Sequence, residues 1–178
     1  MGKRSNFERV ERDFYPTPYK AVEPLVQHLP KKQFAFAEPC AGDGALVEHI
    51  ENMTNGWCSW ASDLEPQTKS ILTRHFREIG MEDLFEADYI ITNPPWDRSL
   101  LHPMIEYFTA YRPTWLLFDA DWIHTKQSTE YLPLLRKIVS IGRVQWIVDS
   151  KSTGKDNCCW YLFDSCDSQS IDFIGRKP

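Results

Sequence analysis

The sequence lacks a hydrophobic run long enough to span a membrane, and it lacks the start of a secretory signal. No stretch approaches the roughly 18 apolar residues that a transmembrane helix needs. The first residues, MGKRSNFERVERDF, contain no apolar core of a signal peptide. We therefore expect a cytoplasmic protein. The chain has 178 residues, and domains commonly have about 100 to 200 residues, so we expect residues 1–178 to form a single domain.

Cysteine and histidine are too few and too scattered for a disulfide framework or a metal centre. The chain has five cysteines, an odd number, and no two of them have C-x-x-C spacing. Its five histidines show neither H-x-H nor H-E-x-x-H spacing. We expect free thiols in a reducing compartment, and we expect no metal.

Positive charge is scarce in the whole chain but concentrated in two segments. The formal net charge is −5, which argues against nonspecific binding of nucleic acid by the whole surface. Residues 1–20 contain five Lys and Arg against three Asp and Glu, and residues 136–155 contain five against one. If both segments lie on one face, they can meet a phosphate backbone. The alternative is two ordinary solvated stretches on different faces, and the sequence leaves both readings open.

Hydrophobic patterns of strands and helices alternate along the chain. We expect strands at 34–37, 57–63, 88–93, 114–123, 143–149 and 158–164, and helices after Thr17-Pro18 and around 46–53, 71–79, 100–108 and 132–138. Alternating strands and helices predict a three-layer, doubly wound α/β fold of the Rossmann-like kind, with a mostly parallel sheet. The last two strands have no helix between them, so we expect them to form an antiparallel hairpin.

Charged and polar residues stand where several of these strands end. Glu38 closes the first strand, Asp63 closes the second, and Asn93 follows the 88–93 run. In a doubly wound sheet these ends converge on the ligand. Gly42 and Gly44 allow close backbone approach, and a carboxylate at the second strand end suits ribose hydroxyls. A dinucleotide fits poorly, because the third glycine of G-x-G-x-x-G is missing and Glu38 would repel a pyrophosphate. A ribose-bearing ligand with a cationic group fits better.

The segment Asn93-Pro94-Pro95-Trp96 has unusual chemistry for a strand end. Two adjacent prolines fix two φ angles near −65° and remove two backbone donors. The loop is therefore stiff, and its carbonyl groups remain able to accept hydrogen bonds.

Four motifs together carry a family resemblance: DFYPTP (13–18), EPCAGDG (38–44), ASDLEP (61–66) and ITNPPW (91–96). Their order resembles that of the class I S-adenosylmethionine-dependent methyltransferases. Within that class it is most similar to the DNA adenine-N6 methyltransferases, especially the small enzymes of phages and prophages. The resemblance implies a seven-stranded sheet, S-adenosylmethionine as the cofactor with S-adenosylhomocysteine as its product, and DNA as the partner. Only 82 residues follow Trp96 and the predicted strands and helices use nearly all of them, so we expect no separate target-recognition domain, unlike in larger relatives.

The resemblance also assigns residues to the cofactor. Tyr15, Thr17 and Pro18 correspond to the segment that borders the methionine end, and Glu38, Pro39, Cys40, Ala41, Gly42, Asp43 and Gly44 correspond to the motif around the methionine and ribose. Asp63 is expected to accept the ribose hydroxyls, with Glu65 close enough to share or replace it. Asp83 corresponds to the acid that accepts the amino group of the cofactor's adenine, with Glu82 as an equally charged neighbour.

The catalytic residues are expected in the proline loop, residues 93–96. The Asn93 side-chain oxygen and the Pro94 carbonyl are each expected to accept one hydrogen of the target amino group, while Pro94 and Pro95 keep these acceptors rigid. Trp96 offers an aromatic face for the target base. Adenine must be flipped out of the duplex or be single-stranded to reach such a site.

Lys151 and Lys155, in the polar loop 150–157, are the candidates for contact with nucleic acid. An exposed hairpin tip is an equally good reading of that loop. RNA adenine and protein glutamine are alternative acceptors of the methyl group for an enzyme with the same loop. The alternative that is not an enzyme is an inactive subunit with the cofactor-binding fold.

Overall fold

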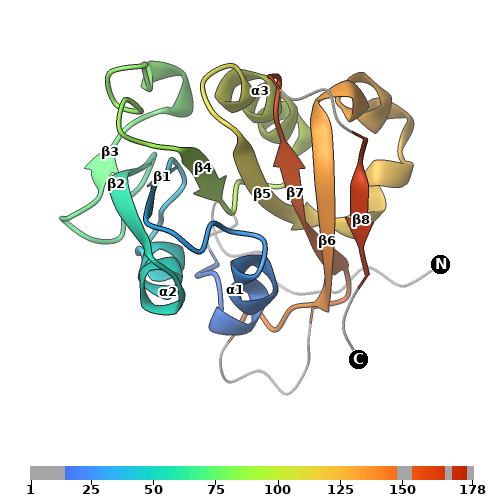
Figure 1. Ribbon diagram of the computed structural model, residues 1–178, viewed down its shortest axis with the longest axis horizontal. Coiled ribbons are helices and arrows are strands. Elements are labelled where there is room, and N and C mark those ends of the chain that lie inside the picture. The colour runs from blue at the N-terminus through green and yellow to red at the C-terminus, as the bar shows by residue number, and fades with distance from the viewer. Residues whose placement is uncertain (1–14, 148–153, 167–169, 176–178) are drawn as a thin grey trace.

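The computed structural model describes residues 15–147, 154–166 and 170–175. Its described strands form one sheet in the order β3-β2-β1-β4-β5-β7-β6-β8 (Figure 1). Their bounds are β1 (Phe34–Glu38), β2 (Gly56–Asp63), β3 (Leu72–Thr73), β4 (Tyr89–Thr92), β5 (Thr114–Asp119), β6 (Leu135–Arg143), β7 (Asn157–Phe163) and β8 (Asp172–Ile174). Strand β7 is antiparallel to β5 and β6, and the other pairs are parallel. The predicted α/β fold class is confirmed, with eight strands instead of seven because β8 adds an edge strand beside β6.

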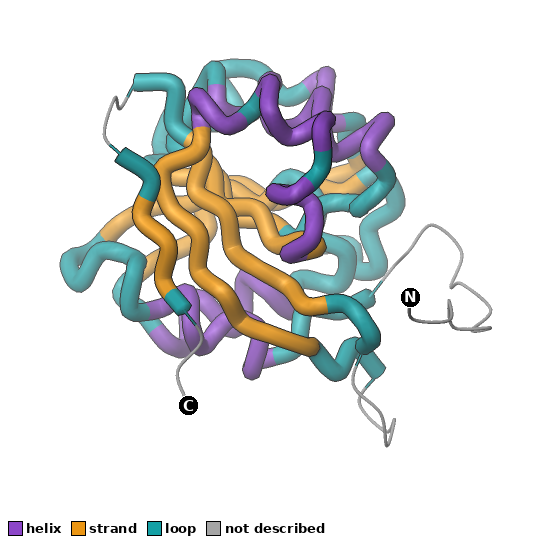
Figure 2. Tube along the Cα trace, turned by 90° about the vertical axis from the view of Figure 1, so that its right-hand side faces the viewer, coloured by secondary structure: helices purple, strands orange, loops and turns teal. Residues whose placement is uncertain are grey.

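Helices cover both faces of this sheet, which gives the three predicted layers (Figure 2). Helices α1 (Tyr19–Val26) and α2 (Ala45–Met53) lie on one side, and α3 (Arg98–Thr109) lies on the other with the short 3-10 helices η3 (Ala120–His124), η4 (Lys126–Glu130) and η5 (Leu132–Leu134). Phe36, Leu46 and Trp160 belong to the core beneath α1 and α2. Phe118 and Trp122 belong to the core on the α3 side. Each layer is thus closed by buried aromatic and aliphatic side chains.

Most predicted elements occur where the sequence indicates them. Strands β1, β2, β4 and β7 and helices α2 and α3 coincide with their predicted ranges to within a few residues. Helix α1 also begins after Pro18, but Thr17 does not cap it, because the N-cap position is Pro18 and no side chain accepts there. The Thr17 hydroxyl instead accepts a hydrogen bond from the Asn93 side chain.

The helix predicted at 71–79 is wrong. This segment contains the two-residue strand β3 and the 3-10 helix η2 (Phe76–Glu78). Ile71, Phe76 and Ile79 are buried, but Leu72 is half exposed because it lies on the edge strand. The apolar spacing that resembled a helix therefore arises from an irregular segment that covers the sheet edge.

The helix predicted at 132–138 is also wrong, and so is the strand predicted at 143–149 over residues 144–147, while residues 148 and 149 lie outside the described range. Strand β6 occupies Leu135–Arg143, and its buried positions repeat every three or four residues, as in a helix. Two features cause this pattern. The register shifts against β7 between Leu135 and Lys137 and between Ser140 and Gly142, and both faces of the strand are buried, since Ile138 belongs to the α3-side core and Val139 to the core beneath α1 and α2. Each shift adds a residue to one strand and interrupts the period of two. Gly142, with φ 76°, supplies the left-handed conformation at the second shift.

The strand predicted at 114–123 is too long. Strand β5 ends at Asp119, and residues 120–124 form η3. The Asp119 side chain accepts the backbone N–H of Asp121 and so caps η3. The apolar residues Trp122 and Ile123 that prolonged the pattern pack from this 3-10 helix onto the α3-side core.

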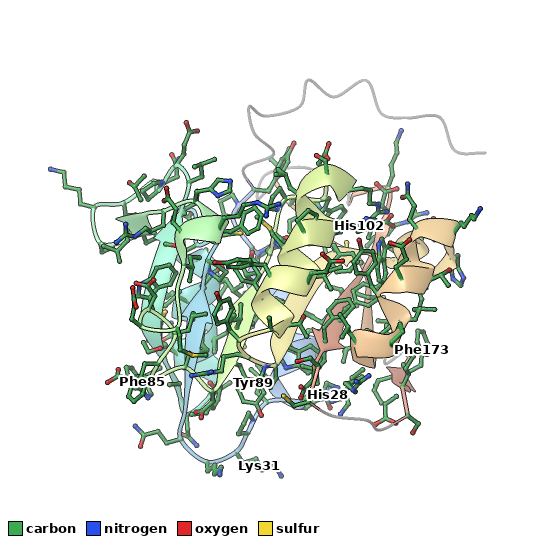
Figure 3. All side chains as sticks on the ribbon, turned by 90° about the horizontal axis from the view of Figure 1, so that it is seen from above. His28, Lys31, Phe85, Tyr89, His102 and Phe173 are labelled. Atoms are coloured by element: carbon green, nitrogen blue, oxygen red, sulfur yellow. The ribbon has the colours of Figure 1, made fainter. Side chains whose placement is uncertain are left out.

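Because β1, β2, β4 and β5 are parallel, their carboxyl ends all lie at the same end of the sheet. Figure 3 shows Lys31, Phe85 and Tyr89 at the other end, where β1 and β4 begin, and His102 lies away from them.

In the described ranges, no helix is long and apolar enough to cross a bilayer.

Candidate functional site

The connection from β1 to α2 is a tight glycine turn that rests against the end of β2. Gly42 and Gly44 have φ angles of 55° and 88°, a region in which a side chain is strained. The Gly42 N–H donates to Asp63 Oδ2 at 2.9 Å, and the Ala41 N–H donates to the Ser62 carbonyl at 2.9 Å. These two hydrogen bonds fix the turn against the end of β2.

Asp63 is a fixed and half-buried carboxylate. Besides the Gly42 bond, its Oδ1 accepts the Glu65 N–H at 2.7 Å. Burial raises the pKa of Asp63, and the Gly42 N–H opposes that change. Each carboxylate oxygen has more than one lone pair, so both oxygens retain capacity for a ligand hydroxyl. The side chain of Glu65, the alternative ribose acceptor, belongs to an exposed residue.

Glu38 is the most unusual ionisable group of the site. It is only 1% exposed, and its Oε2 has no hydrogen-bond partner among the described residues. Burial raises the pKa of Glu38 well above its ordinary value, and the nearby Asp63 and Asp43 carboxylates raise it further. The Val47 backbone N–H opposes this only in part. A buried acid with an unsatisfied oxygen and two acidic neighbours is suited to a cationic ligand.

The remaining residues of the glycine motif line the same turn. Pro39 and Ala41 are buried, and Cys40 is half buried. Burial, followed by the charge of Asp63, raises the pKa of the Cys40 thiol, so it remains protonated and is not a nucleophile. Tyr15 and Pro18 are half buried at the start of the described chain.

Asp83 lies in the turn between η2 and β4. Its Oδ2 accepts the Gly80 N–H at 2.8 Å, and the residue is half buried, whereas Glu82 is exposed. Asp83 therefore has a structural contact of its own, and its role toward an adenine ring stays a prediction.

The proline loop after β4 holds the Asn93 carboxamide at both ends. Asn93 Nδ2 donates to Thr17 Oγ1 at 3.2 Å, and Trp96 Nε1 donates to Asn93 Oδ1 at 3.3 Å. Thr17 and Pro94 are buried, and Pro95 is half buried. The side-chain oxygen can still accept another hydrogen bond, because a carbonyl oxygen has two lone pairs. The carboxamide is thus oriented by the protein before any substrate arrives.

Trp96 is anchored by its indole edge. Its Nε1 also donates to the Leu117 carbonyl of β5 at 3.1 Å, and the half-buried ring stands perpendicular to Trp146 with 5.7 Å between centroids. Trp146 is a residue that sequence reasoning missed, since a lone tryptophan in a predicted strand carried no signal. The stacking of a base on Trp96 stays a prediction.

Lys155 is exposed in the connection from β6 to β7. Strands β5 and β6 are both antiparallel to β7, so they run in the same direction. The connection from β6 to β7 therefore lies at the same end of the strands as the proline loop. Lys151 lies outside the described residues. The predicted contact of both lysines with nucleic acid stays a prediction.

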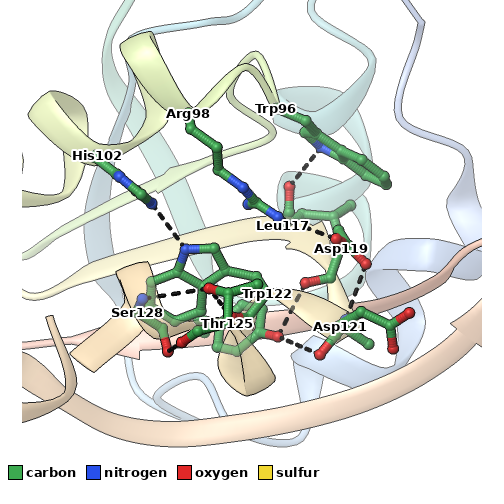
Figure 4. Close-up of polar contacts among 11 residues, drawn as sticks. Trp96, Arg98, His102, Leu117, Asp119, Asp121, Trp122, Thr125 and Ser128 are labelled. Atoms are coloured by element: carbon green, nitrogen blue, oxygen red, sulfur yellow. Dashed lines mark hydrogen bonds and ion pairs between the residues drawn. The ribbon is translucent and has the colours of Figure 1, made fainter.

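Sequence reasoning also missed a polar network where β5 ends (Figure 4). Arg98 and Asp119 form an ion pair with 3.1 Å between Nη2 and Oδ2, and Trp122 Nε1 donates to His102 Nε2 at 3.0 Å. Asp119 ends a parallel strand just as Asp63 does, so the same rule would have found it if the strand had been given its true end. No spacing in the sequence indicates its pairing with Arg98. Among the residues that the structure covers, no group of His, Cys, Asp and Glu is arranged to hold a metal ion.

No protein-family model and no curated protein matches this sequence. Solved structures do match in fold. A protein named as a class I S-adenosylmethionine-dependent methyltransferase from Listeria monocytogenes aligns with a TM-score of 0.58 and 10% identity over 97% of this chain and 68% of its own. One named as an RNA methyltransferase from Pyrococcus horikoshii aligns with a TM-score of 0.55 and 15% identity over 89% and 90%.

A third match is a protein named as a modification subunit of a type I restriction enzyme from Vibrio vulnificus, with a TM-score of 0.52 and 15% identity over 91% of this chain. This chain covers 47% of that subunit. These identities establish the architecture and leave the chemistry to the residues. The chain has the Rossmann-like fold of the class I S-adenosylmethionine-dependent methyltransferases.

Proposed function

We propose that this protein transfers a methyl group from S-adenosylmethionine to the exocyclic amino group of adenine in DNA. The observation that carries the proposal is the Asn93 carboxamide, which is oriented by Thr17 and Trp96 at the end of β4. The glycine turn ends the neighbouring strand β1. The family resemblance of the NPPW segment directs the proposal to adenine and DNA.

The residues present fit S-adenosylmethionine as the cofactor. The unsatisfied Glu38 oxygen among acidic neighbours suits a cationic amino acid portion, and Asp63 retains acceptor capacity for ribose hydroxyls. The left-handed Gly42 and Gly44 let the backbone approach the ligand without a Cβ atom in between. When bound, this cofactor supplies a methyl group on a sulfonium cation.

Asn93 and Pro94 would activate the acceptor nitrogen. The lone pair of an aromatic amine is delocalised into the ring, so the amine is a poor nucleophile. Asn93 Oδ1 and the Pro94 carbonyl accept its two hydrogens and favour the pyramidal nitrogen that bears a localised lone pair. Because Asn93 is already held and Pro94 and Pro95 restrict the backbone, little reorganisation is required when the nitrogen reacts. No general base is needed for this activation. The methyl–sulfur bond would break as the N–C bond forms, S-adenosylhomocysteine would be the leaving group, and the methylated nitrogen would release one proton to water.

The test is to incubate the purified protein with labelled cofactor and three acceptors: unmethylated duplex DNA, RNA, and a protein bearing an accessible glutamine. We expect label in DNA as N6-methyladenine, and none with Asn93→Ala. Label only in RNA or only in protein would transfer the proposal to that acceptor. Cofactor binding without transfer to any of the three would identify a cofactor-fold subunit instead of an enzyme.

A further inference from the structure

The ion pair between Arg98 and Asp119 joins two segments that both border the proline loop. Arg98 is the first residue of α3, directly after the loop, and Asp119 is the last residue of β5 (Figure 4). Their side chains are 30% and 24% exposed, so the pair is partly shielded from water. Such shielding preserves more of its electrostatic energy than a surface pair keeps.

The same strand end binds the loop a second time. Trp96 Nε1 donates to the carbonyl of Leu117, two residues before Asp119 on β5, and also to Asn93 Oδ1. Residues 96 and 98 are therefore both attached to the end of β5. Release of Arg98 would remove the side-chain link between the start of α3 and the end of β5, and Trp96 Nε1 would then be held less firmly against the Leu117 carbonyl and Asn93 Oδ1.

Asp119 is itself held rigidly, so it serves as the anchor of the pair. Its Oδ1 accepts the Asp121 N–H at 2.9 Å. Its backbone carbonyl accepts the Tyr161 hydroxyl at 3.1 Å, and that tyrosine is fully buried on β7. A fixed carboxylate determines where the guanidinium lies, and thereby where α3 and the loop before it begin.

Arg98 also bears an energetic cost. Its Nη1 is buried without a hydrogen-bond partner among the described residues. An unsatisfied buried donor is unfavourable for folding, and Arg136 has one as well, at Nε, so the control variant chosen below starts from an arginine with the same kind of cost.

We propose that the Arg98–Asp119 ion pair is a positioning pair, which fixes the proline loop against β5 and sets the orientation of the Asn93 carboxamide. The catalytic part of this inference rests on the proposed function. The pair acts through the loop and does not touch the substrate.

The test compares Arg98→Ala, Arg98→Lys and Asp119→Asn with Arg136→Ala. Arg136 is a matched control, because it is a half-buried arginine that donates to backbone carbonyls near the start of β6. This position is at the end of the sheet opposite to the proline loop. The first readout is hydrogen exchange of the Trp96 indole N–H, assigned with Trp96→Phe. The internal reference is the indole N–H of Trp160, which donates to the Ala21 carbonyl.

We expect Arg98→Ala and Asp119→Asn to accelerate exchange at Trp96 at least tenfold and to leave Trp160 unchanged. We expect kcat to fall by about ten- to a hundredfold with an unchanged dissociation constant for the cofactor, as displacement of a positioned group implies. Arg98→Lys should recover part of both effects, because it keeps the charge without the planar fork. Arg136→Ala should change neither.

Unchanged exchange at Trp96 in both Arg98→Ala and Asp119→Asn would overturn the proposal, and so would faster exchange with an unchanged kcat. Should Arg98→Ala not fold, Arg98→Lys and Asp119→Asn decide the matter. A wild-type protein that methylates none of the acceptors would refute the proposed function, while the exchange measurement would still decide whether the pair holds the loop.

Discussion

The two halves of the candidate site are built in different ways. On the side of β1 and β2, the backbone makes the site: the Gly42 amide and the Glu65 amide both donate to Asp63. On the side of β4 and β5, side chains distant in sequence make it, as in the bonds from Asn93 to Thr17 and from Trp96 to Leu117. The first half joins segments 21 residues apart through backbone amide groups, whereas the second joins segments 21 and 76 residues apart through side-chain donors. Mutations should therefore separate cofactor binding from transfer.

The largest separation is expected from Asn93→Ala. Loss of one fixed acceptor of the reacting group should lower kcat by at least a hundred- to a thousandfold, on the order of 3 to 4 kcal/mol. The cofactor's dissociation constant, measured by calorimetry, should change little, because the interaction is made mainly in the transition state. Asn52→Ala, at an exposed position of α2, is the control. Retained transfer in Asn93→Ala would remove the mechanism.

Asp63→Asn should show the opposite behaviour. This variant keeps the shape of the side chain but removes its charge and one of the two oxygens that accept the Gly42 and Glu65 N–H groups. We therefore expect cofactor affinity to weaken by about ten- to a hundredfold, roughly 1.4 to 2.8 kcal/mol. The value of kcat at saturating cofactor should fall far less. Glu65→Gln is the matched variant, and Glu48→Gln on the exposed face of α2 is the control. A normal affinity in Asp63→Asn together with a weakened one in Glu65→Gln would transfer the ribose role to Glu65.

The glycine turn can be tested through stability alone. Gly44 has a φ angle of 88°, and an added Cβ would find its nearest neighbour, Ile71 Cδ1, at 3.6 Å, so space is available and only the backbone is strained. Gly44→Ala should lower the free energy of unfolding by about 1 to 2 kcal/mol, as measured by urea denaturation. Gly80→Ala is the control, since its nearest neighbour is the flexible Glu82 side chain at 3.5 Å. Equal effects of the two substitutions would contradict this account of the turn.

The smallest effect is a change in the pH dependence of stability, and it concerns Glu38. Burial and the nearby acids raise the pKa of its carboxyl in the folded state above the ordinary value of 4.5. The folded protein therefore binds more protons than the unfolded chain above pH 4.5, and the contribution of Glu38 to the free energy of unfolding falls as the pH rises toward the folded-state pKa.

Glu38→Gln removes this ionisation while keeping a similar shape. We expect urea denaturation at several pH values to give a flatter decline of stability with pH for Glu38→Gln than for the wild type. Glu48→Gln, at an exposed position of α2, is the control. A slope in Glu38→Gln identical to that of the wild type would show that Glu38 ionises normally despite its burial.

Two errors in the sequence-based fold have a common physical origin. The buried residues Leu135, Ile138 and Val139 are spaced as in a helix, yet they belong to β6. A register shift lies between Leu135 and Ile138, and Ile138 and Val139 are buried in the cores on opposite faces of the sheet. Ile71, Phe76 and Ile79 are buried from an irregular segment at the sheet edge. Periodicity measures which residues are buried, and it identifies the backbone conformation only where the element is regular.

The α/β class, the places of β1, β2, β4 and β7, and the glycine and proline motifs at the strand ends could be predicted from the amino-acid sequence, because they depend on local conformation and on short patterns of burial. The orientation of the Asn93 carboxamide, the contact of Trp96 with Trp146 and the pairing of Arg98 with Asp119 could be seen only in the folded chain. These contacts join separate strands and helices. Their partners are chosen by the packing of the sheet and its layers, which no local pattern in the chain encodes.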